Sequence, residues 1–149
     1  MHPFAYVLIL AYFVMTLVAN SLSSTIERAA HTQRISIAGS IAIYAKVASD
    51  YAKAHPSIDS AISPEVLSSP DWFNRNSRVS AYALNGFAYV YFSADNADEA
   101  GQIARACPKG VRCTVVVNGW MYEPGSLTAF ASVPRGRGLP SNNAVMLRF

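Results

Sequence analysis

Residues 22–54 read LSSTIERAAHTQRISIAGSIAIYAKVASDYAKA, and this stretch predicts the helix on which the domain is built. Its apolar side chains recur at helical spacing, so they form a continuous stripe along one face, and most of the charged side chains fall off that stripe. The helix is expected to end near His55, because Pro56 disfavours helix at the residue before it. The stripe fits either packing in the domain core or contact with a partner helix. Its residues are Ile37, Ile41, Tyr44, Ala48 and Tyr51.

The chain before this helix is strongly apolar. It carries no Asp, Glu, Lys or Arg ahead of Glu27, and Pro3 to Leu22 approach the roughly 20 residues that a helix needs to cross a bilayer. Residues 1–22 are therefore expected to form a transmembrane helix, and so long an apolar segment argues against a buried helix of a soluble core. The side chains expected to hold it in lipid are Phe4, Tyr6, Val7, Leu8, Ile9, Leu10, Phe13, Val14, Leu17 and Val18.

Two questions about this segment stay open at the level of sequence. A cleaved signal peptide is an alternative to an anchor, because Ala19–Ser21 resemble a cleavage site, although no Lys or Arg precedes the apolar run. The second helix either starts afresh at Ser24, which forms a capping-box pattern with Glu27, or continues the first.

The orientation of the domain is a separate question. Arg28 and Arg34 would by themselves place the following domain in the cytoplasm.

The cysteines favour the opposite orientation. Cys107 and Cys113 are the only two, in the stretch ACPKGVRC, where Pro108 and Gly110 let the chain turn back. A disulfide closing so short a loop contributes roughly 2 kcal/mol and persists in the periplasm rather than the cytosol. Two unpaired buried thiols are the alternative. Two cysteines do not make a zinc site, so no metal and no other cofactor is expected.

Two Asn-Gly pairs predict the turns of a sheet. Asn85-Gly86 lies between two alternating apolar runs within residues 78–94, which is a strong signal for a β-hairpin, and Asn118-Gly119 predicts a second one. Further strands are expected within 127–133 and 144–149, and a short helix within 95–106. Residues 56–77 contain three prolines and many serines, so they are expected to form a loop with one helical turn at Pro64–Ser68.

The expected fold is therefore α+β: a long N-terminal helix, membrane-spanning and then amphipathic, packed on a small antiparallel sheet with one short inserted helix. The predicted parts are a transmembrane helix over 1–22, an amphipathic helix over 23–55, and a sheet domain over 56–149 that forms one globular unit with the amphipathic helix. This order of elements resembles the pilin architecture, although the basic leader ending in glycine that a pilin precursor requires is not found in the sequence.

Several classes of function are disfavoured. The sequence has no P-loop, no dinucleotide-binding glycine motif, no nucleophile elbow and no H-E-x-x-H, so no catalytic or cofactor-binding residue is predicted and the chain is expected not to be an enzyme. The net charge is +3, and the basic residues are scattered rather than interleaved with aromatic ones, which argues against nucleic acid as a partner.

In its size, its opening helix and the stretch IAIYAKVASDYAKAHP at 41–56, the chain resembles the plasmid-type PilM family of conjugative thin pili, a type IVB system. The resemblance implies an inner-membrane component of the pilin transport apparatus or pilus basal body. Together with the apolar opening segment and the two cysteines, it predicts a single-pass protein with its C-terminal domain in the periplasm. The implied partners are the lipid bilayer and other pilus-assembly proteins or pilins, with a homo-oligomer as a further option. The alternatives are a minor pilin built into the fibre and an exported periplasmic protein released from a signal peptide.

Overall fold

The computed structural model describes residues 3–70, 73–135 and 137–149; for residues 3–11, 18–20 and 22–24 it describes the backbone only. The chain divides into two compact units, one reaching to Gln33 and the other formed by Arg34–Phe149.

The helix α1 runs without interruption from Pro3 to Ala54. It is continuous across Ser24, so the amphipathic stretch continues the opening helix and does not start a second one. The helix ends two residues before Pro56, as the sequence predicts.

In the first unit, α1 exposes large apolar side chains all round. Tyr12, Phe13, Val14, Met15 and Leu17 are between 53% and 77% exposed, and four of them are consecutive, so they point in all directions about the helix axis. Three of these belong to the predicted anchor; its other side chains lie outside the described residues, namely Phe4, Tyr6, Val7, Leu8, Ile9, Leu10 and Val18. Within the part of the chain that the structure describes, no helical segment is found that is both long and apolar enough to cross a bilayer.

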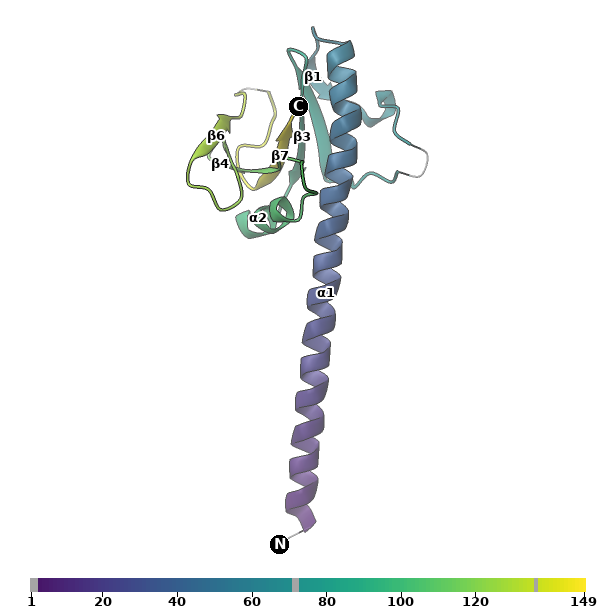
Figure 1. Ribbon diagram of the computed structural model, residues 1–149, viewed down its shortest axis with the longest axis vertical. Helices are drawn as coiled ribbons and strands as arrows, with labels where there is room; N and C mark the ends of the chain where they lie inside the picture. The colour runs from purple at the N-terminus through teal and green to yellow at the C-terminus, as the bar shows by residue number, and fades with distance from the viewer. Residues whose placement is uncertain (1–2, 71–72, 136) are drawn as a thin grey trace. The chain divides into compact units, whose positions relative to one another are not determined.

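The second unit contains a seven-stranded antiparallel sheet with the order β1-β2-β3-β7-β4-β5-β6. The last described strand, β7, therefore lies at the centre of the sheet, between β3 and β4 (Figure 1). The strands are β1 (Asp59–Ile62), β2 (Val79–Leu84), β3 (Phe87–Ser93), β4 (Thr114–Val117), β5 (Trp120–Tyr122), β6 (Ala129–Ser132) and β7 (Ala144–Arg148).

Both predicted Asn-Gly hairpins are confirmed. Asn85 and Gly86 join β2 to β3 with φ angles of 51° and 78°, and Asn118 and Gly119 join β4 to β5 with φ angles of 51° and 76°. A two-residue turn with positive φ at both positions matches the twist of the flanking strands, and asparagine and glycine adopt that conformation at the least cost.

The prediction that residues 56–77 form a loop is wrong over Asp59–Ile62, which form the edge strand β1. Among the described residues, this strand pairs only with β2. Three of its four residues are exposed, and its sequence, DSAI, does not alternate between apolar and polar residues. The predicted helical turn is confirmed as a short 3₁₀ helix at Pro64–Val66. The strands predicted within 127–133 and 144–149 are confirmed as β6 and β7.

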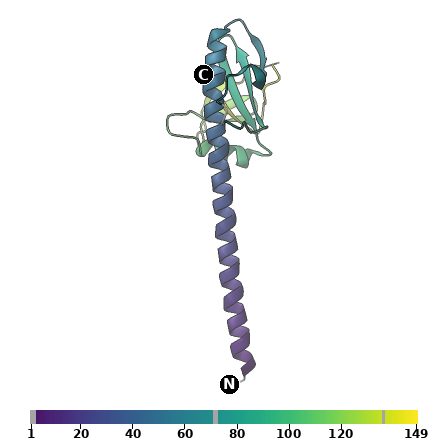
Figure 2. The same cartoon turned by 90° about the vertical axis from the view of Figure 1, so that its right-hand side faces the viewer.

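The two faces of the sheet have separate cores. Residues 34–54 of α1 and the inserted helix α2 (Ala97–Arg105) cover one face, as the two views show (Figure 1, Figure 2). The strands present mostly small and aliphatic side chains to these helices, together with Phe92 of β3, whereas the opposite face is rich in tyrosine and methionine. Loop residues Val133 and Leu139 pack over that second face.

Candidate interaction surfaces

The stripe of α1 lies in the core of the second unit. Ile41, Tyr44 and Ala48 are no more than 1% exposed, Ile37 is 7% exposed, and Tyr51 is half-buried against them. The stripe packs among the apolar side chains of the sheet. Of the two alternatives for this face of the helix, the structure therefore has packing in the domain core.

Tyr44 is the most unusual member of this stripe. Its ring stacks on Phe73 at 6.5 Å between centroids, and the Arg75 guanidinium lies 5.6 Å from the ring centre. Its hydroxyl is buried and has no hydrogen-bond partner among the described residues, and neither has the hydroxyl of Ser40 one turn earlier. Burial raises the pKa of Tyr44, and the positive charge of Arg75 partly opposes the rise.

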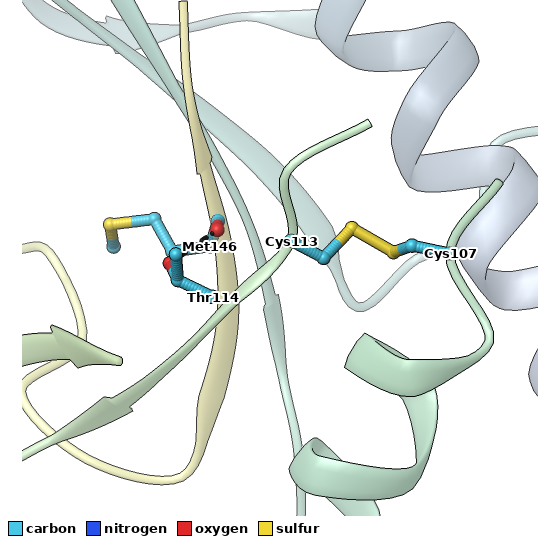
Figure 3. The surroundings of a disulfide bond; sticks show 4 residues. All are labelled: Cys107, Cys113, Thr114 and Met146. Atoms are coloured by element: carbon cyan, nitrogen blue, oxygen red, sulfur yellow. Dashed lines mark hydrogen bonds between the residues drawn. A yellow bond between two sulfur atoms is a disulfide. The ribbon is translucent and has the colours of Figure 1, made fainter. Parts of the chain in front are cut away.

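The predicted disulfide between Cys107 and Cys113 is present, with the two Cα atoms 6.3 Å apart (Figure 3). Cys107 follows the end of α2, and Cys113 directly precedes β4. The next side chain, Thr114, is buried, and its Oγ1 donates a hydrogen bond of 2.7 Å to the carbonyl of Met146 (Figure 3). The disulfide thus links the C-terminal end of α2 to the central strands of the sheet.

A cavity of about 510 Å³ opens beside the disulfide loop. Arg112 at its edge forms an ion pair of 3.2 Å with Glu123, and its guanidinium lies 4.8 Å from the centre of the Phe130 ring. The charges of Arg112 and Glu123 therefore neutralise each other.

The opposite face of the sheet holds a polar cluster that the sequence did not reveal. The Tyr82 hydroxyl donates a hydrogen bond of 2.7 Å to Oδ1 of Asp59, and Arg137 forms an ion pair with Oδ2 of the same carboxylate. The hydrogen bond to Asp59 raises the pKa of Tyr82. The cluster ties the loop after β6 to the edge strand β1. No local pattern connects positions so far apart in the sequence.

Among the described residues, no group of three or more His, Cys, Asp or Glu side chains is close enough together to hold a metal ion. The ion pairs described above hold loops in fixed positions on the sheet. Arg137 joins the loop after β6 to β1, and Arg112, before β4, joins Glu123, after β5.

Comparison with known proteins assigns the chain to a family. A search of solved structures matches the crystal structure of a protein assigned as pilM from Pseudomonas aeruginosa 2192, at 22% identity and a TM-score of 0.45, over 78% of this chain and 94% of that one. A comparison with curated proteins gives no match. The PilM family model matches residues 7–147. Because that match spans nearly the whole sequence, the chain belongs to the PilM family, which points to a pilus-related system.

Proposed function

We propose that the protein is a single-pass inner-membrane component of a type IV pilus assembly apparatus, part of its basal body, and that it serves conjugation. In this proposal the second unit lies in the periplasm and contacts other pilus-assembly proteins. The protein acts by binding and positioning these partners rather than by catalysis. Family membership supports the link to pilus assembly.

The observation that carries the membrane part of the proposal is the exposed apolar surface of α1. The apolar side chains of Tyr12, Phe13, Val14, Met15 and Leu17 are exposed all round the helix, and such a surface needs cover from lipid or protein. The hydroxyl of Thr16, within this segment, donates to the carbonyls of Tyr12 and Phe13 at 3.1 and 2.9 Å. A hydroxyl satisfied within its own helix is compatible with a surrounding that contains no water.

The disulfide supports the periplasmic location of the second unit. Structural disulfides form and persist in oxidising compartments, and Cys107 and Cys113 are the only cysteines in the sequence. If the second unit faced the cytosol, the reducing conditions there would keep both thiols reduced.

Carbonate extraction of membranes tests the anchor. The native protein should stay in the pellet, and Val14→Arg should move a large share of it to the supernatant, because an arginine at the middle of a spanning helix costs roughly 3 kcal/mol. The control is Ile35→Arg, which changes an exposed side chain of the same helix in the second unit and should stay in the pellet. Release of the native protein by carbonate would refute the anchor.

Three further measurements separate the remaining alternatives. Alkaline phosphatase fused after Phe149 should be active, whereas activity of only a cytosolic fluorophore at the same position would refute the periplasmic location. Immunoblots should find the protein in washed membranes; recovery mainly with sheared fibres would identify it as a minor pilin. The intact mass should include residues 1–22. A mature chain starting near Leu22 would instead indicate a cleaved signal peptide.

A further inference from the structure

We propose that a groove between α2 and the β4–β5 hairpin binds an apolar segment of a partner protein that carries a carboxylate. This inference rests on the proposed function only in that pilus assembly supplies the partner proteins. The α2 groove, as we name it, encloses about 450 Å³. Its lining includes Gly101 and Arg105 of α2, Val117 and Tyr122 of the hairpin, and Leu127 of the following loop.

The walls of the α2 groove expose apolar side chains that the rest of the domain does not cover. Leu127 is 99% exposed and Val117 is 39% exposed. The position of Leu127 is fixed by the turn around it, in which the Thr128 N–H donates to Oγ of Ser126 at 3.1 Å and the Ser126 N–H donates to the Glu123 carbonyl at 2.9 Å. An ordered loop therefore presents a leucine to solvent at the edge of a groove, where a partner would bury it at little entropic cost.

The base of the groove leaves space for a ligand at Gly101. A Cβ atom built on this residue would meet only Nη2 of Arg105, at 3.9 Å. The guanidinium of Arg105 therefore lies over Gly101, one helical turn back along α2, rather than pointing away from the groove.

The charges around the groove indicate what the partner must carry. Glu123 is paired with Arg112, and Asp98 of α2 accepts a hydrogen bond of 2.6 Å from Gln102. Arg105 has no anionic partner among the residues that the structure describes. An apolar groove with one unpaired guanidinium is complementary to an apolar segment with a carboxylate, because a charge-assisted hydrogen bond between them would satisfy both groups as they lose water.

Fluorescence titration of peptides against the full-length protein in lipid nanodiscs tests this, with empty nanodiscs as the blank. The probe is a labelled peptide of about twelve Leu and Ala residues with one central Glu, and the comparison peptides carry Gln or Lys at that position. The Glu peptide should bind about tenfold more tightly than the Gln peptide. Arg105→Glu should reverse the preference, so that the Lys peptide binds more tightly than the Glu peptide.

Two variants separate the groove from the general charge of the surface. Gly101→Leu fills the groove while raising helix propensity, so it should abolish binding of every peptide without lowering the thermal unfolding midpoint. Lys109→Glu makes the same charge change as Arg105→Glu at an exposed lysine outside the groove, and it should alter affinity less than twofold.

Three results would overturn the inference: equal binding of the Glu and Gln peptides, no binding of the Glu peptide up to about 1 mM, or unchanged binding to Gly101→Leu. Sedimentation of the protein alone adds a fourth, because a dimer that Leu127→Asp dissociates would identify a second copy as the occupant. The titration tests only peptide binding to the groove, and carbonate extraction tests only membrane attachment, so either proposal can be refuted without the other.

Discussion

Removing the hydroxyl oxygen from two tyrosines of the domain should change its stability in opposite directions. Tyr44 is 1% exposed, and its hydroxyl has no hydrogen-bond partner among the described residues. The Tyr82 hydroxyl, in contrast, donates to Asp59 at 2.7 Å. The same substitution, Tyr to Phe, therefore removes an unsatisfied group at one position and a satisfied one at the other.

The size of the Tyr44 effect follows from the cost of burying a polar group. Mutational data place that cost at roughly 1–3 kcal/mol for a hydroxyl without a partner. Tyr44→Phe keeps the ring that stacks on Phe73 and lies beside Arg75, so little packing is lost. We expect Tyr44→Phe to raise the free energy of unfolding by about 1 kcal/mol, and Tyr82→Phe to lower it because Asp59 loses its donor.

Tyr44→Phe should also differ from the native protein at alkaline pH. Burial raises the folded-state pKa of Tyr44 above its usual 10.0, so the folded state holds this proton more tightly than the unfolded state does. The stability linked to this proton is fully present below pH 10 and is lost as the pH rises through the folded-state pKa. Tyr44→Phe should therefore lose less stability than the native protein above pH 10.

Urea unfolding of the full-length protein in a mild detergent, followed by intrinsic fluorescence at pH 7 and above pH 10, measures both effects. Tyr82→Phe is the control for the loss of a tyrosine oxygen. If Tyr44→Phe lowers the free energy of unfolding by more than about 0.5 kcal/mol, the hydroxyl has a partner in the folded protein and the reasoning fails.

Three other predictions test the remaining structure in the same assay. Replacing both Cys107 and Cys113 by Ala should lower the free energy of unfolding by roughly 2 kcal/mol. Dithiothreitol should lower the stability of the native protein by the same amount and leave the double variant unchanged. Ile41→Ala, in the core, should cost about 2–5 kcal/mol, whereas Ile35→Ala, which is half exposed, should stay within about 0.5 kcal/mol. Arg78→Ala removes two ion pairs and a contact with an aromatic ring; it should cost about 1 kcal/mol or less, and high salt should reduce the difference.

The features that the sequence determined are those set by residues close together along the chain. The Asn-Gly turns were predictable because positive φ angles favour these residues in adjacent positions, and the end of α1 was predictable because Pro56 restricts the residue before it. The disulfide follows the same rule, since Cys107 and Cys113 are separated by a segment that can turn. The apolar opening segment, with its lack of charge, is likewise a property of composition.

The tertiary structure alone decided the features that depend on distant residues. Edge strand β1 has no apolar alternation, and it becomes a strand only because β2 supplies its hydrogen-bond partners. Arg137 reaches Asp59, and Leu127 faces the groove beside Arg105, only after the sheet has brought their elements together. Propensity, turns and short loops act through the nearest few residues, whereas strand order, ion pairs and grooves depend on which segments finally share the core. That choice is made by burial over the whole domain, so no local pattern in the sequence records it.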